Sequence, residues 1–369
     1  MSKVIVIDGT STSYGGGLTH LIEFLKEGLK SEYFFEIIIS KEIESNIPKS
    51  KNIKIITHEL LYKTLIHRYF FKLFLLDKYI NPQAYALISL SGDYIGRFKP
   101  FLGMCQNMLL YEKEKRSGMS FFERFKFEIQ KIIQIKSFKK SDGIIFLSNH
   151  AKSKVSSLVG YKRMKVINFG ISSRFINENR KFKSSNSFSL LYVSSIHTYK
   201  NQLNLLLALK SLLEEGIKLN LTLVGPILDK SYWTKIEKVI KEINFKSKCI
   251  NYLKYVNYDE MHKIYNNHSI FVFPSICENM PNILLEACAS KIPIISSKEG
   301  PMPEFMENNA VYFNPLDIKS IKDKILYSMN NFDILKKNSE RAFLNLKKYS
   351  WKKNFDNTIE LIEEIKNDV

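Results

Sequence analysis

The sequence predicts an α/β protein built from two doubly wound parallel sheets that face each other across a cleft, and three observations support this. Short apolar runs alternate with helical patterns along the chain, as in βαβ units. The alternation comes in two blocks, separated by a polar stretch at residues 177–189 that has no periodic signal. The chain has 369 residues, enough for two domains of about 100–200 residues each.

The first block opens with a strand, a glycine loop and a helix. Residues 3–8 form a short apolar run typical of a buried strand, and Gly15-Gly16-Gly17 follow it. Residues 18–30 then place apolar side chains on one helical face. The same patterns predict further strands near 34–39, 53–57, 85–90, 143–147 and 164–167, and helices at 60–80, 120–140 and 149–158.

The second block repeats the alternation more regularly. Strands are expected at 190–194, 219–224, 249–253, 269–273, 292–296 and 310–313, with helices at about 201–215, 230–244, 258–266, 282–289 and 317–330. Two more helices are expected within 333–366, with Trp351 between them. We therefore predict an N-terminal Rossmann-like domain at 1–176 and a C-terminal one at 177–351. A last helix, at about 352–369, is expected to pack back on the first domain.

The composition is that of an ordinary globular protein, with 45% apolar and 25% charged residues. The 15 glycines and 10 prolines exclude collagen-like and proline-rich classes. The four cysteines, at positions 105, 249, 277 and 288, have no CxxC spacing, which argues against a zinc site and more strongly against a disulfide framework. The sequence lacks a recognisable signal peptide and any apolar run near the roughly 20 residues of a membrane span. These features predict reduced thiols and a cytoplasmic location.

The charge is strongly basic and uneven. The formal net charge is +18, and residues 1–180 hold 29 Lys and Arg against 16 Asp and Glu. Such an excess predicts an anionic partner: a nucleic acid, an acidic membrane or a phosphorylated substrate. Scattered solvated lysines are the alternative. Because no nucleic-acid-binding module is recognisable, we do not expect a nucleic acid as partner.

Two segments combine basic and aromatic residues. Residues 113–165 hold 14 Lys and Arg against 4 Asp and Glu, and phenylalanines are interleaved with them, among them Phe121, Phe122, Phe125, Phe127 and Phe138. The stretch from Leu61 to Ile80 mixes Lys63, Arg68, Lys72 and Lys78 with Tyr69, Phe70, Phe71 and Phe74. Such segments suit helices that lie on an anionic bilayer, which predicts peripheral membrane attachment. The alternative is that the aromatics pack in the core beneath solvated lysines.

The segment Phe271-Val-Phe-Pro-Ser-Ile-Cys-Glu278-Asn-Met-Pro281-Asn282-Ile-Leu-Leu-Glu286-Ala is the most informative one. A buried strand ends at its proline, a loop carries Glu278, and Pro281 suits the first position of a helix. Glu286 lies in the second turn, on the same face as Asn282. The free N–H groups of a helix start bind phosphate. The two carboxylates would repel phosphate, so we expect them to hold sugar hydroxyls.

Two glutamates separated by seven residues in this context resemble the signature of glycosyltransferase family 4, whose members are retaining, nucleotide-sugar-dependent enzymes of GT-B fold. The resemblance extends to Ile292-Pro-Ile-Ile-Ser, Pro303-Glu304, Leu223-Val-Gly225-Pro226 and the Gly15-Gly16-Gly17 loop. Cys105-Gln-Asn-Met108, followed by Glu112, is similar to transferases of bacterial O-antigen and capsule synthesis.

The resemblance implies roles for particular residues. Glu278 would contact the transferred sugar and support its developing positive charge, and Glu286 would bind the nucleotide ribose. Lys200, in Leu191-Tyr-Val-Ser-Ser195-Ile-His-Thr-Tyr-Lys200, occupies the position of a lysine that clamps the diphosphate. The family's accompanying arginine is replaced by Ser195, so Lys200 would carry more of the charge stabilisation. The donor-binding residues implied are Glu286, Met280, Pro281, Asn282, Ile283, Gly16, Gly17 and Tyr255.

Other positions leave alternatives open. Gly16 and Gly17 lie in a loop that faces the cleft in this family, or form a plain turn; the Gly-x-Gly-x-x-Gly spacing of a dinucleotide site is absent. His20 either reaches the cleft or has a structural role, and the sequence favours neither alternative over the other. Many family members have an acceptor-side histidine where this chain has Cys105-Gln106-Asn107. This weakens the case for an enzymatic base, and the leaving phosphate can accept the acceptor's proton instead.

The sequence therefore predicts a retaining hexosyltransferase that uses a UDP- or GDP-sugar and acts in bacterial surface polysaccharide synthesis. The resemblance implies that the N-terminal domain binds the acceptor and the C-terminal domain binds the nucleotide sugar. The expected acceptor is a glycan or an undecaprenyl-diphosphate-linked glycan. The protein is expected to be cytoplasmic and attached peripherally to the inner face of the plasma membrane. No Asp-x-Asp pair of metal-dependent GT-A enzymes is present, so no metal and no cofactor are expected. The rival readings are a Rossmann oxidoreductase or epimerase and a non-catalytic GT-B scaffold protein.

Overall fold

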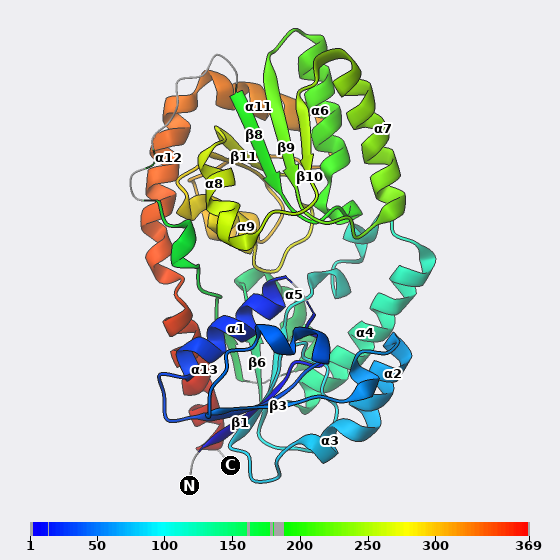
Figure 1. Cartoon of the computed structure of the whole chain (residues 1–369), viewed down its shortest axis with the longest axis vertical. Helices are drawn as coiled ribbons and strands as arrows, with labels where there is room; N and C mark the ends of the chain where they lie inside the picture. Colours follow the sequence, from blue (N-terminus) through cyan, green and yellow to red (C-terminus); the bar gives the residue numbers. More distant parts are fainter. Residues whose placement is uncertain (1–2, 14, 161–162, 178–179, 181–187, 368–369) are drawn as a thin grey trace. The chain divides into compact units, whose positions relative to one another are not determined.

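The computed structural model describes residues 3–13, 15–160, 163–177, 180 and 188–367. The chain divides into two compact units (Figure 1). Unit 1 comprises Met1–Tyr111, Phe121–Gly170 and Tyr349–Val369, and unit 2 comprises Glu112–Ser120 and Ile171–Lys348. Each unit contains one parallel sheet, so the predicted fold class is confirmed.

The sheet of unit 1 has seven parallel strands in the order β3-β2-β1-β4-β5-β6-β7. The strands are β1 (Val4–Asp8), β2 (Phe34–Ile38), β3 (Ile53–Ile56), β4 (Ala86–Ser89), β5 (Phe101–Cys105), β6 (Gly143–Phe146) and β7 (Arg163–Val166). The sequence patterns missed β5, whose apolar run is interrupted by Gly103. A Cβ at Gly103 would lie 2.8 Å from the ring of Phe138, so close packing of a helix on the sheet requires this glycine.

The helices of unit 1 include α1 (Gly16–Gly28), α4 (Phe121–Lys140), α5 (Asn149–Val159) and α13 (Trp351–Lys366). Helix α13 packs on α1, where the rings of Phe24 and Phe355 lie 5.0 Å apart. Its Glu363 carboxylate accepts hydrogen bonds from Lys3 at 3.0 Å and from the Tyr33 hydroxyl at 2.8 Å. The C-terminal helix thus completes the core of unit 1. The sequence predicted Trp351 between two helices, whereas in the structure it is the first residue of α13.

The single helix expected at 60–80 is wrong, because this segment is broken into short pieces. A 3-10 turn (Glu59–Leu61) precedes α2 (Leu65–Phe70), a π-helical turn (Phe71–Leu75) and α3 (Leu76–Tyr79). The π-helical turn buries the side chains of Phe71 and Lys72. Since π-helical turns are often found at functional sites, the buried lysine is a feature to follow.

The sheet of unit 2 has six parallel strands in the order β10-β9-β8-β11-β12-β13. They are β8 (Phe188–Val193), β9 (Leu219–Val224), β10 (Ile250–Leu253), β11 (Ile270–Phe273), β12 (Ile294–Ser297) and β13 (Val311–Phe313). The helices are α6 (Gln202–Glu214), α7 (Lys230–Ser247), α8 (Met261–Asn266), α9 (Asn282–Ala289), α10 (Met302–Met306), α11 (Ile318–Asn330) and α12 (Phe332–Leu344). Helix α10 was not predicted, because it is short and lies among prolines.

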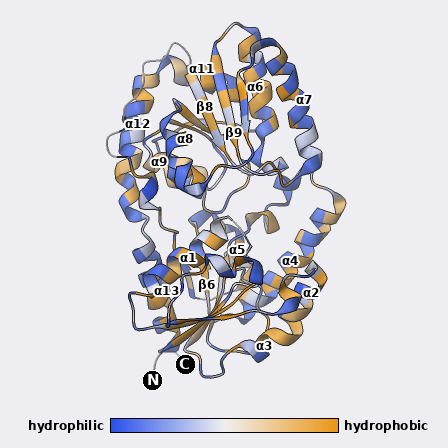
Figure 2. Ribbon diagram, in the orientation of Figure 1, coloured by the Kyte–Doolittle hydropathy of each residue, from blue (hydrophilic) through white to orange (hydrophobic). Residues whose placement is uncertain are grey.

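Apolar residues follow the strands of both sheets, and polar residues dominate the outer faces of the helices (Figure 2). The core of unit 2 is a continuous cluster around β8, β9 and β11, in which Leu190, Leu221 and Phe271 are fully buried. Strands covered on both faces are apolar throughout, which explains why their runs were readable in the sequence. Among the described helices, none is both long and apolar enough to cross a bilayer.

Candidate active site

The strand order of unit 2 reverses between β8 and β11, which are hydrogen-bonded neighbours. In open parallel sheets such a switch point leaves a crevice at the carboxyl ends of the strands, where ligands bind. The loop after β8 leads to Lys200, and the loop after β11 leads to Glu278. The topology therefore places the two predicted catalytic residues on the two loops that flank the switch point.

Lys200 and Glu278 form a direct ion pair, with 2.6 Å between Nζ and Oε1. Their side chains are only 11% and 12% exposed. Burial lowers the pKa of Lys200, but the Glu278 carboxylate beside it raises this pKa above its ordinary value. The ammonium is thus charged at neutral pH. An anionic ligand at this point would compete with Glu278 for Lys200.

The backbone around Lys200 is fixed by local contacts. Its carbonyl accepts a hydrogen bond of 2.7 Å from the buried Tyr192 hydroxyl, and Asn201 adopts a left-handed conformation with φ of 59°. The Asn201 side chain donates to the carbonyl of Pro315 at 2.6 Å. This arrangement ends the short turn Thr198–Lys200 and starts α6 directly behind it. The lysine is therefore held by the strand-to-helix connection itself.

Gly225, part of the Leu-Val-Gly-Pro motif, permits a close approach of two loops. Its φ is 140°, and a Cβ there would lie 2.2 Å from the carbonyl oxygen of Ser194. Ser195, the position where the family has arginine, uses its carbonyl to accept a 2.8 Å hydrogen bond from Gln202. The glycine thus allows the end of β9 to lie against the loop that leads to Lys200.

Glu286 projects from the second turn of α9 and is partly buried. The Tyr265 hydroxyl donates to its Oε2 at 3.2 Å and the Tyr258 hydroxyl to its Oε1 at 3.4 Å. Burial raises the pKa of Glu286 to about 7, although both tyrosine hydrogen bonds lower it. The carboxyl therefore changes protonation near neutral pH, and as a carboxylate it is a strong acceptor for hydroxyl donors.

The start of α9 differs in detail from the prediction. Pro281 is the N-cap residue and Asn282 is the first helical residue, so Pro281 does not occupy the first helical position as predicted. The N–H of Asn282 donates to the carbonyl of Met280 at 2.9 Å, which engages it within the chain. Met280 is buried, while Ile283 is partly exposed. The Asn282 Oδ1 is buried and has no hydrogen-bond partner in the described part of the chain.

The segment Glu112–Ser120, which we call the strap, belongs to unit 2 although its neighbours in sequence belong to unit 1. The Cys277 thiol donates to Glu112 Oε2 at 3.2 Å, and both side chains are buried. Burial and the Glu112 carboxylate hold the pKa of Cys277 well above its usual range, so the thiol keeps its proton. Glu112 thereby holds the residue directly before Glu278.

The strap also touches the ends of two more strands. Lys115 forms an ion pair with Glu299, which follows β12. A Cβ on Gly118 would lie 3.4 Å from the methyl group of Thr198, in the loop after β8. The sequence indicated Glu112 only as part of a motif. The prediction of two continuous domains, 1–176 and 177–351, did not include the assignment of the strap to unit 2. The charged run from Glu112 to Arg116 was the only available signal.

Two tyrosines of the segment after β10 differ in their exposure and contacts. Tyr255 is 81% exposed, whereas Tyr258, three residues later, donates to the Glu286 carboxylate. The ring of Tyr258 also packs edge-on against the buried Phe175, with centroids 5.3 Å apart. This segment therefore presents Tyr258 to Glu286, a residue that sequence reasoning missed.

The candidate residues of unit 1 lie at the start of α1. Gly16 is its first residue, and a Cβ on Gly17 would lie 3.1 Å from the Gln106 side chain, so the glycine loop adjoins the Cys105-Gln106-Asn107 segment. His20 is buried, lies 3.2 Å from the Asn354 Oδ1 and stacks on Phe169. Burial lowers the pKa of His20 to about 4. These contacts favour the structural reading of His20.

Among the described residues, no group of three or more His, Cys, Asp or Glu side chains is arranged to hold a metal ion. None of the four cysteines forms a disulfide, and all four are buried.

Solved structures identify the class of fold. The chain has a TM-score of 0.81 and 15% identity to sucrose-phosphate synthase from Thermosynechococcus elongatus, covering 100% of both chains. It has a TM-score of 0.74 and 14% identity to Anabaena Alr3699/HepE, solved in complex with UDP and glucose, covering 98% of this chain and 100% of that one. The fold is therefore GT-B, as the sequence resemblance implied.

Sequence comparison relates unit 2 to a known family. Residues 173–342 match the family described as glycosyl transferases group 1. The chain is 24% identical over 221 residues to the O-antigen chain mannosyltransferase B of Escherichia coli, covering 56% of this chain and 57% of that protein. It is 25% identical over 205 residues to the capsular polysaccharide biosynthesis glycosyltransferase CapM of Staphylococcus aureus, covering 51% and 52%.

The matches thus span about half the length of these curated relatives. They confirm the resemblance to bacterial polysaccharide glycosyltransferases that the motif around Glu278 and Glu286 indicated.

Proposed function

We propose that the protein is a retaining glycosyltransferase that moves a hexosyl group from a UDP- or GDP-sugar to a glycan acceptor in bacterial surface polysaccharide synthesis. The observation that carries this proposal is the buried Lys200–Glu278 pair at the switch point of a group 1 glycosyltransferase domain. The complex of Alr3699/HepE with UDP and glucose supports a nucleotide-sugar donor. The O-antigen and capsule relatives support a polysaccharide acceptor.

In this mechanism Lys200 binds the donor's diphosphate and stabilises the negative charge that grows on it as the glycosidic bond breaks. Binding of the diphosphate draws Lys200 away from Glu278. The freed Glu278 carboxylate then faces the sugar and stabilises the positive charge at its anomeric carbon. The buried setting of both groups strengthens these interactions, since the surrounding dielectric is lower than that of water.

The acceptor hydroxyl attacks the face of the sugar that the diphosphate leaves, which gives retention. The leaving phosphate oxygen takes the proton of the attacking hydroxyl, so no enzymatic base is required. His20 is unsuited to that task, because it is buried and its pKa is lowered to about 4.

Glu286 holds the ribose of the nucleotide in this proposal. Its carboxylate accepts a hydrogen bond from a ribose hydroxyl, and the Tyr258 and Tyr265 hydroxyls fix its orientation. The unpartnered Asn282 Oδ1, on the same helix, offers a second acceptor to the donor. Because the ribose is bound before and during transfer, Glu286 acts mainly on donor affinity.

The acceptor is proposed to be a lipid-linked glycan, such as one carried on undecaprenyl diphosphate, reached by peripheral attachment to an anionic membrane. In the two basic and aromatic segments, some of the aromatic side chains are exposed and others pack in the core. Several large apolar side chains are exposed: Ile66 at 81%, Phe74 at 65%, Phe121 at 77%, Phe122 at 82% and Phe125 at 57%. Phe71 and Phe138 are buried in the core. Ile66 lies on α2 and Phe74 on the π-helical turn. The three exposed phenylalanines lie on α4, which also carries Arg124 and Lys126.

Turnover of a panel of UDP- and GDP-sugars tests the function. The purified chain is incubated with each donor, and release of UDP or GDP is measured with and without a membrane extract as acceptor source. We expect turnover of at least one donor, with the new linkage in the donor's anomeric configuration by NMR. Donor binding without any turnover would favour the scaffold reading, and a tightly bound nicotinamide would favour the oxidoreductase or epimerase.

A further inference from the structure

Unit 1 has a switch point of its own, at which a second polar cluster gathers. The strand order reverses between β1 and β4, which are hydrogen-bonded neighbours. The loop after β1 carries Ser11, and the loop after β4 carries Ser91 and Asp93. By the rule applied to unit 2, the carboxyl ends of these two strands are where unit 1 would bind a ligand.

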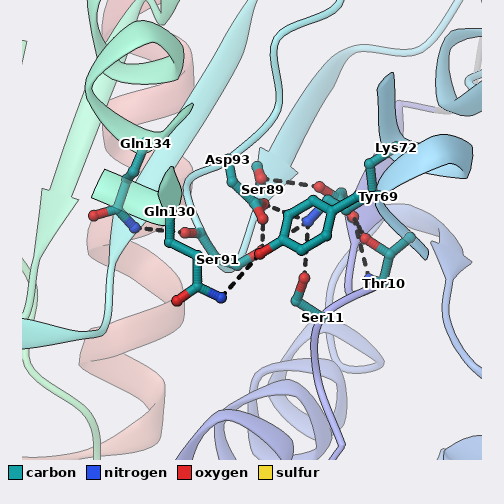
Figure 3. A network of polar contacts seen from close by, with 10 residues as sticks. Thr10, Ser11, Tyr69, Lys72, Ser89, Ser91, Asp93, Gln130 and Gln134 are labelled. Atoms are coloured by element: carbon teal, nitrogen blue, oxygen red, sulfur yellow. Dashed lines mark hydrogen bonds and ion pairs between the residues drawn. The ribbon is translucent and has the colours of Figure 1, made fainter. Parts of the chain in front are cut away.

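A buried lysine organises this cluster (Figure 3). Lys72, from the π-helical turn, forms an ion pair with Asp93 and donates to the Ser11 hydroxyl at 2.9 Å and the Ser91 hydroxyl at 3.3 Å. Its side chain is only 3% exposed. Beneath it, Asp8 accepts hydrogen bonds from Thr10 at 2.6 Å and Ser89 at 2.9 Å. The two loops are thus tied together by charged groups with several hydrogen bonds each.

A cavity of about 230 Å³ lies against this cluster. Its polar wall includes Ser11, Tyr69, Ser91, Asp93, Gln130 and Gln134. Gln130, on α4, donates to the Tyr69 hydroxyl at 2.9 Å, and Gln134, one turn later, donates to the Ser91 carbonyl at 2.7 Å (Figure 3). The donors and acceptors are therefore fixed by each other before any ligand arrives, which reduces the entropic cost of binding.

The charge of the wall selects the chemistry of the ligand. Asp93 is the one charged side chain among the described residues that line the cavity, and the Lys72 ammonium balances it. A phosphate or diphosphate would find no unbalanced cation there. Hydroxyls, carboxylate and amides side by side suit a ligand with several neutral hydroxyl groups. Leu110 and Ile133 add apolar surface for its C–H groups.

We propose that this cavity binds one neutral sugar ring of the glycan acceptor. The volume lies below the roughly 300–1,000 Å³ of pockets for drug-sized ligands, which limits the site to about one ring. Asp93 accepts hydrogen bonds from the sugar hydroxyls, and the amides of Gln130 and Gln134 position them. The inference rests on the proposed function, because glycosyl transfer to a polysaccharide supplies the reason for a sugar here.

Ligand-detected NMR of the full chain tests this proposal. The probes are the methyl glycosides of mannose, glucose, galactose and N-acetylglucosamine, each at millimolar concentration. We expect saturation transfer to at least one of them and a loss of most of that signal in Gln130→Leu. Gln83→Leu, the same change at an exposed position of unit 1, serves as control and should keep the signal. Tyr69→Phe replaces Gln130→Leu if the latter does not fold.

Two further measurements distinguish a sugar site from an anion site and separate this proposal from the proposed function. Inorganic diphosphate should leave the glycoside signal unchanged, and displacement would show an anion site and overturn the proposal. A lack of signal from all four glycosides, or an unchanged signal in both Gln130→Leu and Tyr69→Phe, would overturn it as well. Nucleotide-sugar hydrolysis without acceptor should be equal in wild type and the control variant Gln83→Leu. Absence of donor turnover by wild type in the presence of the membrane extract would refute the proposed function separately.

Discussion

Each unit has a buried lysine–carboxylate pair at its switch point, and the two pairs differ in their surroundings. Lys200 and Glu278 come from the loops after neighbouring strands, and the start of α9 and Glu286 follow directly. Lys72 comes from a π-helical turn, and hydroxyl groups surround its pair with Asp93. In unit 2 an anionic donor is proposed to break the ion pair, whereas in unit 1 two serine hydroxyls accept hydrogen bonds from the lysine of the pair.

The difference teaches how the proposed division of labour arises. In the proposed mechanism the donor breaks the ion pair of unit 2, which couples donor binding to release of Glu278. In unit 1 the pair supports the wall of a cavity, and the ligand contacts the neutral groups around it. The predictions below test the two halves of this contrast, beginning with the largest expected effect.

Lys72→Met should lower the stability of the protein by about 3–5 kcal/mol, because it leaves Asp93 as an uncompensated buried charge. Thermal unfolding followed by circular dichroism measures this. The double variant Lys72→Met/Asp93→Leu removes both charges and should recover much of the loss. A single variant as stable as wild type would show that the pair does not support the unit 1 site.

Glu286→Gln should raise the KM for the donor about 10- to 150-fold with a smaller change in kcat, since a charged hydrogen bond to a ribose hydroxyl contributes roughly 1.5–3 kcal/mol. The wild-type KM should fall as pH rises through about 7, because the pKa of Glu286 lies there and the carboxylate is the better acceptor. Steady-state kinetics from pH 6 to 8 check both. An unchanged KM in the variant would remove Glu286 from the donor site.

Replacement of both Phe121 and Phe122 by serine should weaken binding to vesicles that contain anionic phosphatidylglycerol by roughly tenfold, because two exposed rings no longer enter the bilayer interface. Co-sedimentation at low salt measures this, and high salt should weaken wild-type binding further. Phe245→Ser is the matched control, since Phe245 is 91% exposed on unit 2. Equal binding to neutral and anionic vesicles at all salt concentrations would contradict the electrostatic part.

EDTA should have the smallest effect, a change in turnover of less than about twofold, because Lys200 is assigned the charge stabilisation that a metal would otherwise supply. The measurement is donor turnover before and after chelation. Complete loss of activity, restored by manganese, would refute this assignment.

The parts of the fold that could be predicted from the sequence are those governed by local pattern. Buried parallel strands such as β8 and β11 form continuous apolar runs, and the Glu278–Glu286 spacing stands in one uninterrupted segment. Strand β5 was missed, because packing against Phe138 demands a glycine in its middle. The segment at 60–80 has helical spacing, but it contains a π-helical turn with the buried Lys72, and periodicity does not indicate such a turn.

The missed parts of the candidate site depend on contacts between distant segments. Glu112 lies 165 residues before Cys277, and Lys72 lies 61 residues after Ser11. No local spacing encodes such pairs, so Lys72 could be read only as one cation in a basic and aromatic stretch. Tyr255 and Tyr258 are both tyrosines of one segment, and only the three-dimensional turn before α8 decides which of them reaches Glu286.

The central claim is that Glu278 stabilises the transferred sugar during reaction, and the kcat of Glu278→Gln tests it most directly. Once a donor is known, we predict a kcat at least about 100-fold below wild type, with a smaller change in donor KM. Glu242→Gln provides the matched control, because Glu242 also pairs with a lysine, Lys210, at 2.8 Å, but on the exposed surface of unit 2. Its kcat should equal that of wild type. A folded Glu278→Gln enzyme with wild-type kcat would contradict the account.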